Sequence, residues 1–417
     1  MIEKITANPF FRNSAILFGG TMLANAINYL FHLLVGRMVS VEVYGEIESL
    51  TSLINIISVP AMTLTFIATR YASHSKATGN ENESRVLFRY LNGKILKYGW
   101  PFFLVFLALL PQIRDFLKIE SLWPIFLVWL MMVISIFSAI PGGILNGWQK
   151  FKSASWVGIW GALVKLVSAI VIIRLGFELS GAIGGFLLGV LASYLAAIFT
   201  LRFIFGSEKN TPPKKEDLVN FASIKKYALP VLIGSLSINI LGNADMLLAK
   251  HNLDQITAGN YGALTIVSKI IFFATGVIAT VLFSMSAEKD HRKEQTSRTL
   301  KMAFLGVFLT AGTATLIYYL FPQLILSLLF GDKYVASAGY LVWFAILVTF
   351  YSLANLFIQY LLSIKKTFPI YGMLIVSGIM AGGIFFFGHS IYAILEIAIL
   401  SQILAVFWGL IYLKKYA

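Results

Sequence analysis

Apolar residues run along this chain in long blocks separated by short polar connections. A helix rises 1.5 Å per residue, so about 20 residues cross the roughly 30 Å hydrocarbon layer of a bilayer. Most of the blocks reach this length, which predicts membrane-spanning helices rather than barrel strands. We place twelve spans near residues 14–36, 45–69, 95–111, 121–145, 154–174, 181–204, 227–249, 260–286, 301–329, 336–363, 368–387 and 389–412.

The composition supports this interpretation. Of 417 residues, 58% are hydrophobic and 12% charged, and the mean hydropathy is +0.80, whereas soluble domains are about half apolar and a quarter charged. The chain contains no cysteine, which excludes disulfides, a thiolate nucleophile and Cys-ligated metal sites. The first fourteen residues lack the pattern of a cleaved signal peptide, so we expect the first span to be retained. We therefore predict an all-α polytopic membrane protein.

The distribution of Lys and Arg predicts the orientation. The chain has 33 basic and 19 acidic residues and a net charge of +14. Basic residues favour the cytoplasmic connections of a membrane protein. With both termini in the cytoplasm, most basic residues face that side, and we expect this surplus to attract anionic lipids rather than nucleic acid. The basic residues left on the outer side are Arg37, Arg114, Lys118, Arg174, Lys250 and Lys333.

The chain repeats itself. One shift aligns Tyr44-Gly45 with Tyr261-Gly262, and nearly the same shift aligns residues 145–157 with 361–373. Because the shift covers six helices, the two halves have parallel orientation, as in repeats related by an axis along the membrane normal. We expect two six-helix lobes and an architectural role for the Tyr-Gly pairs. The expected boundaries are 1–205 for the first lobe, 206–226 for a cytoplasmic linker and 227–417 for the second lobe.

Away from the ends of the predicted spans, four ionisable residues lie inside them, where charge is costly unless it faces protein or water. They are Lys165, Asp245, Lys269 and Glu396. Lys165 is a candidate to hold an anionic ligand as a point charge, or it is a structural lysine that snorkels or pairs with a carboxylate. Asp245 and Lys269 are candidates for a salt bridge that forms in one state. Asp245 and Glu396 are the candidate ion-coupling carboxylates, for H⁺ or Na⁺; an interhelical acid is the alternative for Glu396.

Polar residues also mark one face of the first span. Thr21, Asn25, Asn28 and His32 are spaced i, i+4, i+7 and i+11, which places them on one side of a helix. We expect them, with Asn239 in the seventh span, to line a cavity. Hydrogen bonding between helices is the alternative. Arg70 at the cytoplasmic end of the second span is a candidate contact for an anionic ligand, or an interfacial anchor.

Several longer segments carry a family resemblance. They are "GRMVSVEVYGEIESLTSLINI", "ILNGWQKFKSASWVGIWGALVKLVSAIVIIRLGFELSGAIGG" and "INILGNADMLLAKHNLDQITAGNYGALTIVSKI". With these the chain resembles the multidrug/oligosaccharidyl-lipid/polysaccharide (MOP) flippase superfamily, and its Wzx-type polysaccharide flippases most closely.

The resemblance implies a V-shaped transporter of two six-helix lobes that alternates between inward-open and outward-open states. It implies as cargo an undecaprenyl-pyrophosphate-linked sugar repeat, flipped to the periplasmic leaflet of the bacterial inner membrane, and as a possible partner the polysaccharide polymerase machinery. For such a cargo, Lys165 is the candidate to hold the pyrophosphate or an acidic sugar, and Arg70 is the candidate first contact for pyrophosphate. The polar residues of the first span and Asn239 are then the candidates to bind sugar hydroxyls. Asp245 stands where the family pattern has an aspartate. The pattern's acids in the first lobe are missing here, so it implies no ion site in that lobe.

Three other functions stay open. A cation-coupled drug antiporter of the same superfamily would need an acidic, aromatic cavity rather than Lys165 and Lys269. A membrane enzyme of polysaccharide assembly would need catalytic groups on a sizeable outer loop, whereas the predicted outer connections are short. A channel would need a filter-like segment, and no such segment stands out. We expect a transporter without catalytic residues or a bound cofactor.

Overall fold

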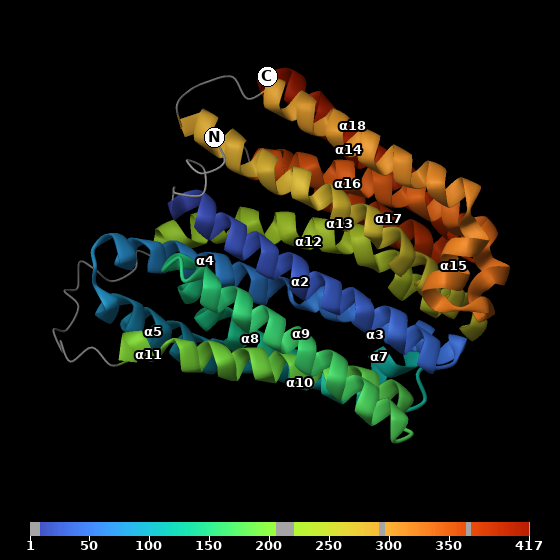
Figure 1. Ribbon diagram of the computed structural model, residues 1–417, viewed down its shortest axis with the longest axis horizontal. Coiled ribbons are helices and arrows are strands. Elements are labelled where there is room, and N and C mark those ends of the chain that lie inside the picture. The colour runs from blue at the N-terminus through green and yellow to red at the C-terminus, as the bar shows by residue number, and fades with distance from the viewer. Residues whose placement is uncertain (1–8, 206–220, 292–296, 364–367, 417) are drawn as a thin grey trace. The chain divides into compact units, whose positions relative to one another are not determined.

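The computed structural model describes residues 9–205, 221–291, 297–363 and 368–416, and helices dominate this part of the chain (Figure 1). The α-helices are α2 (Pro9–Met38), α3 (Val41–Ile57), α4 (Val59–Ala77), α5 (Glu81–Tyr98), α6 (Trp100–Ala108), α7 (Leu110–Leu117), α8 (Leu122–Gly147), α9 (Phe151–Arg174), α10 (Glu178–Thr200), α11 (Arg202–Phe205), α12 (Phe221–Asn252), α13 (Gln255–His291), α14 (Ser297–Leu320), α15 (Pro322–Phe330), α16 (Leu341–Ser363), α17 (Phe368–Phe387) and α18 (Ile391–Tyr416). A 3₁₀ helix, η2 (Asp332–Tyr340), precedes α16.

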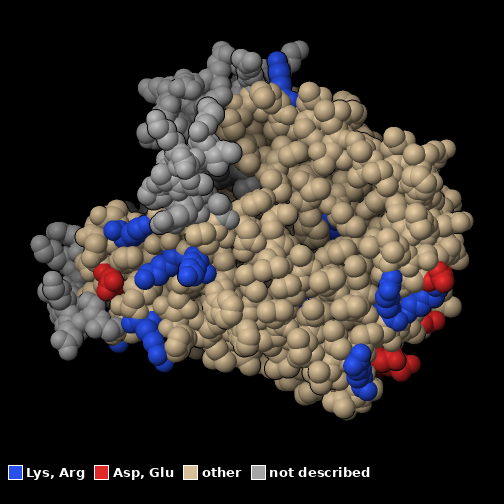
Figure 2. All heavy atoms as spheres, in the orientation of Figure 1, with Lys and Arg blue, Asp and Glu red and all other residues tan. Residues whose placement is uncertain are grey.

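The helices confirm the predicted membrane architecture. Within the described residues, ten helices are long and apolar enough to cross a bilayer, and two broken helix pairs bring the number to twelve if each pair is one span. Large apolar side chains remain exposed along them, as on α14 at Met302, Leu305 and Phe308. On the face shown in Figure 2, charged side chains gather near helix ends and the helix lengths between them are almost uncharged. Such surfaces suit contact with lipid.

Prolines explain the two broken pairs. The expected span 45–69 is divided between α3 and α4 at Ser58, and the expected span 95–111 starts later, with α6 and α7 meeting at Leu109 at a bend of 45°. Pro60 and Pro111 stand in the first turn of α4 and α7, the helices that follow the two breaks. Proline lacks the N–H that would continue the preceding helix, but it is tolerated where helical N–H groups have no partner anyway.

Side-chain caps define other helix starts. The Asn80 side chain accepts a hydrogen bond from the Asn82 N–H at the start of α5. Asp254 does the same for α13, where Oδ1 accepts from the Thr257 N–H at 3.0 Å. Hydrogen bonds from the Thr257 side chain and backbone keep the pKa of the Asp254 carboxyl below its usual value. These caps satisfy N–H groups that the helix itself leaves without partners.

The described residues form two compact units. Unit 1 draws on Met1–Met38 and Ile57–Ala228, and unit 2 on Val39–Ile56 and Leu229–Ala417. In unit 1, α9 packs on α2 and α10, while α8 packs on α4 and α10. In unit 2, α16 packs on α13, α14 and α18. Residues 39–56, which include nearly all of α3, pack within unit 2 rather than with the rest of the expected first lobe. Residues 206–220 of the expected linker lie outside the described residues.

Close backbone packing holds α3 in unit 2. A Cβ added at Gly45 would lie 2.8 Å from the backbone nitrogen of Gly259, and one added at Gly259 would collide with the Val41 carbonyl oxygen. Helices α3 and α13 therefore contact each other through backbone atoms at these two glycines. Tyr44 is fully buried beside them, with its ring centroid 5.4 Å from that of Phe330.

Polar contacts complete this interface. The Lys250 ammonium and the Glu46 carboxylate form an ion pair at 3.5 Å, with the Lys250 side chain only 1% exposed. The Lys333 Nζ donates to the Val39 carbonyl oxygen, and the Asn55 Nδ2 donates to the Asn243 Oδ1 at 2.9 Å. Because a buried charge is tolerated only with a partner, these contacts specify where α3 lies in unit 2.

The glycine contact predicts an unusual response to alanine. Gly259→Ala should lower the thermal unfolding midpoint of the purified protein, since overpacking of this kind costs about 1–3 kcal/mol. Gly276→Ala on the same helix is the matched control, because a Cβ there meets nothing within 4 Å, and it should leave the midpoint unchanged or raise it. Equal midpoints for the two variants would contradict the contact.

Candidate functional site

Lys165 lies inside unit 1, where three helices meet. It belongs to α9 and is 7% exposed. Its Nζ lies 4.3 Å from the ring centroid of Phe31 on α2 and 4.3 Å from that of Phe186 on α10. The two rings contact each other edge to face at 4.9 Å. Aromatic faces attract a cation, and this attraction offsets part of the cost of removing the ammonium from water.

Glycines on α10 make room for this lysine. A Cβ at Gly189 would lie 2.7 Å from the Lys165 Cβ, and one at Gly185 would lie 2.8 Å from the Lys165 carbonyl oxygen. The i, i+4 spacing of these two residues puts them on one face of α10, where small residues let helices approach closely. The local sequence therefore builds a tight α9–α10 contact with the lysine stem inside it.

A cavity of about 430 Å³ opens beside Lys165 within unit 1. Of the described residues that line it, Lys165 is the only charged one. The others are apolar, small or neutral polar; the neutral polar ones are Asn28, Ser58, Thr65, Ser135, Ser138 and Ser193.

Hydroxyl groups in this cavity are already used as donors. The Thr65 Oγ1 donates to the Ala61 carbonyl oxygen at 3.1 Å, and the Ser135 Oγ to the Met132 carbonyl oxygen at 2.8 Å. Their oxygen atoms can still accept hydrogen bonds. The cavity thus combines one cation with several neutral acceptors, a chemistry suited to a ligand that carries an anionic group and hydroxyls.

The predicted polar face of the first span is only partly inside this site. Asn28 lines the cavity, and the His32 ring lies 5.1 Å from the Phe31 ring. Thr21 and Asn25 are exposed on α2, and Arg70 is exposed on α4. The structure therefore brings Lys165, Asn28 and His32 together around Phe31 and Phe186.

A second polar cluster lies inside unit 2 around Asp245. This residue of α12 is 5% exposed. Its Oδ2 accepts a hydrogen bond from the Tyr261 hydroxyl at 2.8 Å, whereas its Oδ1 has no hydrogen-bond partner among the described residues. A buried carboxyl group with one unsatisfied oxygen is suited to take up a proton or a small cation.

Lys269 lies next to this cluster but is not paired with Asp245. Its Nζ donates to the Asn243 Oδ1 at 3.4 Å, and in the part of the chain that the structure describes no ion pair joins it to Asp245. The same Asn243 oxygen accepts from Asn55 of α3. Asn243 Nδ2 donates to the Asn239 carbonyl oxygen at 2.9 Å. The candidate salt bridge between Asp245 and Lys269 is therefore not formed among the described residues. The Lys269 ammonium donates to the side-chain amide oxygen of Asn243 instead.

The other candidate carboxylate lies elsewhere. Glu396 is exposed on α18, so the structure does not join it to the Asp245 cluster. Within the described ranges, no group of three or more His, Asp or Glu side chains is placed to hold a metal ion.

Sequence reasoning missed several members of both clusters. Phe31 and Phe186 gave no signal because aromatic residues are common throughout the chain, although the Gly185/Gly189 spacing does indicate a close helix contact. Tyr261 was expected to be architectural, and it donates to Asp245. Asn55 was missed because its partner lies in a distant part of the chain.

Comparison with known proteins supports the fold and the family. Residues 10–288 match the model of the polysaccharide biosynthesis protein family. An uncharacterized membrane protein of Methanocaldococcus jannaschii is 31% identical over 180 residues, which are 40% of this chain and 42% of that protein. The match thus spans less than half the length of this relative.

Two solved structures share the fold. An inward-facing multidrug resistance MATE family transporter of the MOP superfamily has a TM-score of 0.72 at 15% identity, covering 94% of this chain and 98% of its own. The lipid II flippase MurJ in its inward closed conformation has a TM-score of 0.71 at 16% identity, covering 96% and 87%. These likenesses confirm the helical MOP fold predicted from the sequence.

The Asp245 cluster makes a stability prediction. Tyr261→Phe should lower the thermal unfolding midpoint, because it leaves a second oxygen of a buried carboxyl without a partner, a loss of about 1–3 kcal/mol. Tyr319→Phe on the exposed face of α14 is the control and should have no effect. The loss should be smaller when Tyr261→Phe is made in an Asp245→Asn background. Additive effects of the two substitutions would show that the hydrogen bond contributes nothing.

Proposed function

Because this chain belongs to the polysaccharide biosynthesis protein family and has the fold of MOP transporters, we propose that it is a flippase for lipid-linked oligosaccharides. It moves undecaprenyl-pyrophosphate-linked repeat units from the cytoplasmic to the periplasmic leaflet by alternating access, as a Wzx-type protein of the bacterial inner membrane with both termini in the cytoplasm. Its two lobes correspond to the sequence repeat, with α3 exchanged into unit 2.

The observation that carries this proposal is the buried cation of the unit 1 cavity. Lys165 is held between two aromatic rings at the wall of a cavity whose other polar groups are neutral. An ammonium there attracts an anion strongly, because little water competes with it. We assign Lys165 to the pyrophosphate or an acidic sugar of the cargo, and the hydroxyl oxygens and Asn28 to the sugar hydroxyls.

Other candidate residues have supporting roles in this proposal. His32 borders the rings that hold Lys165, so it is placed to contact a sugar at the same site. Asn25, Lys269 and Asn239 are assigned to the path of the cargo, and Arg70 to the first contact with pyrophosphate at the cytoplasmic end of α4.

We assign the coupling of transport to a cation gradient to the Asp245 cluster. A buried carboxyl group with one unsatisfied oxygen binds H⁺ or Na⁺ more readily than a fully paired one. Glu396, exposed on α18, is the less favoured coupling group. The proposed flippase thus uses a cation gradient without any covalent chemistry.

A drug antiporter is the second candidate, since the MATE transporter shares the fold. A cationic drug would be repelled by Lys165. None of the described residues that line the cavity is an Asp or Glu that could bind the positive charge of such a drug. The positive charge on the wall of the cavity therefore favours an anionic cargo.

The test of the cargo is translocation in proteoliposomes of a fluorescent undecaprenyl-pyrophosphate oligosaccharide. Lys165→Gln should reduce the initial flipping rate by about ten- to a hundredfold, since a charge-assisted hydrogen bond contributes about 1.5–3 kcal/mol. Lys152→Gln, an exposed lysine on the same helix, is the control and should flip at the wild-type rate. If the wild-type protein moves a cationic dye but no lipid-linked sugar, the flippase proposal is wrong and the drug antiporter is favoured.

The coupling ion is tested in the same vesicles. Wild-type flipping should accelerate under an imposed H⁺ or Na⁺ gradient, and Asp245→Asn should remove this acceleration while leaving the slow gradient-free rate. Glu120→Gln, an exposed acid of unit 1, should respond as wild type does. If Glu396→Gln abolishes the response and Asp245→Asn does not, the coupling site is on α18.

A further inference from the structure

Helix α5 has two chemically distinct sides. Its buried stripe is Ser84, Leu87, Leu91 and Ile95, and this stripe faces the rest of unit 1, where α5 packs on α4 and α8. The exposed side carries Arg89, Lys94 and Lys97. The apolar stripe therefore packs on the protein, and the cations point away from it.

Aromatic residues accompany these cations. The Lys94 Nζ lies 5.3 Å from the Tyr90 ring centroid and 5.1 Å from that of Tyr98, and the Lys97 Nζ lies 5.4 Å from the Tyr98 ring. We call Arg89, Tyr90, Lys94, Lys97 and Tyr98 the basic face of α5. Leu96 and Trp100 are exposed beside it, and such residues favour the boundary between hydrocarbon and headgroups.

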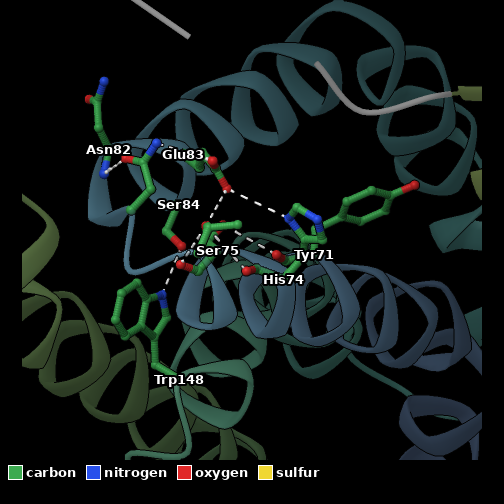
Figure 3. A network of polar contacts seen from close by, with 9 residues as sticks. Tyr71, His74, Ser75, Asn82, Glu83, Ser84 and Trp148 are labelled. Carbon is green, nitrogen blue, oxygen red and sulfur yellow. Dashed lines mark hydrogen bonds and ion pairs between the residues drawn. The ribbon is translucent and has the colours of Figure 1, made fainter. Parts of the chain in front are cut away.

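The acidic residues of α5 are engaged elsewhere. They stand in its first turn, and the Glu83 carboxylate accepts hydrogen bonds from the Asn80 Nδ2 at 3.1 Å and the Thr78 Oγ1 at 3.4 Å. It also lies 3.8 Å from the His74 Nδ1 (Figure 3). No acidic residue follows in the chain until Asp115. Along α5, the acidic residues thus stand in the first turn and the cations of the basic face follow in the later turns.

The same network fixes α5 in place. The Trp148 Nε1 of α8 donates to the buried Ser84 Oγ at 2.8 Å (Figure 3). The Arg85 Nε and Nη2 donate to the carbonyl oxygens of Ile204 and Phe205, at 2.9 and 2.6 Å. Both contacts lie near the start of the helix, so α5 presents its basic face from a rigid base.

The height of this face matches a lipid headgroup layer. The helical path is nearly continuous at Gly99, whose N–H bonds to the Ile95 carbonyl oxygen at 2.7 Å and whose carbonyl oxygen accepts from the Phe103 N–H at 3.1 Å. The candidate span begins at Trp100. Lys97 and Lys94 thus lie about 5 and 9 Å before it along the helix, in or beside a headgroup layer about 5–8 Å thick.

We propose that the basic face of α5 binds the headgroups of anionic phospholipids at the membrane surface. Positive charge, flanking aromatic rings and depth together fit a phosphate-bearing lipid surface, where each Lys or Arg adds to the attraction. This surface is separate from the cavity of Lys165, and the inference does not depend on which cargo the protein moves.

The experiment titrates purified full-length protein in detergent with dioleoylphosphatidylglycerol or dioleoylphosphatidylcholine and measures the thermal unfolding midpoint. Phosphatidylglycerol should raise the midpoint at much lower concentration than phosphatidylcholine. The triple variant R89Q/K94Q/K97Q should need roughly a hundredfold more phosphatidylglycerol for the same shift. The triple variant R37Q/K118Q/R174Q removes the same charge from unit 1 and should respond as wild type does.

Further arms keep the outcome decisive. The charge-preserving variant R89K/K94R/K97R should retain the response, which separates lost charge from damaged folding. Equal stabilisation by the two lipids, or an unchanged response of R89Q/K94Q/K97Q, would overturn the proposal. Stabilisation of the wild type by soluble pyrophosphate that blocks the phosphatidylglycerol effect would also overturn it, because the face would then be a site for the cargo's pyrophosphate.

Discussion

Polar groups inside a hydrocarbon layer have no water to bond with, and the need to satisfy them within the protein governs this structure. Serine and threonine hydroxyls donate hydrogen bonds to helix carbonyl oxygens one turn earlier, as Thr51 does to Ile47 and Thr275 to Ile271. Charged groups need more elaborate arrangements. Lys165 lies between two aromatic rings, and Lys250 is paired with Glu46. At Asp245, the proposed coupling residue, the requirement is left incomplete, because Oδ1 has no hydrogen-bond partner among the described residues.

The sequence repeat places the same Tyr-Gly pair in two different environments. Tyr44 and Tyr261 occupy equivalent places in the two halves, and both are fully buried. Tyr44 packs against the aromatic rings of Phe330 and Tyr334. Tyr261 packs against Phe344 and also donates to Asp245. The duplicated tyrosine is thus packed in the core in both halves, and in the second half it also donates a hydrogen bond to Asp245.

Hydropathy was sufficient to predict the helices, because a span needs only length and apolar composition, and the prolines mark where two spans break. The buried position of Lys165 also followed from its place in an apolar block. The exchange of α3 could not be predicted, since the contact of Gly45 with Gly259 and that of Asn55 with Asn243 depend on which distant helices meet. Periodicity placed Thr21 and Asn25 on the face of Asn28, but only tertiary packing decides which part of that face a cavity reaches.

The exchange of α3 has a consequence for biosynthesis. The helix lies between two stretches of unit 1 in the chain, but the partners of its charged and amide groups, Lys250 and Asn243, are about two hundred residues further on. At about 5–20 residues per second, the ribosome completes α3 roughly 10 to 40 s before α12. During that interval Glu46 and Asn55 are already in or near the membrane without their final partners. Helix α3 therefore reaches its final packing only after much of the second half of the protein has been synthesised.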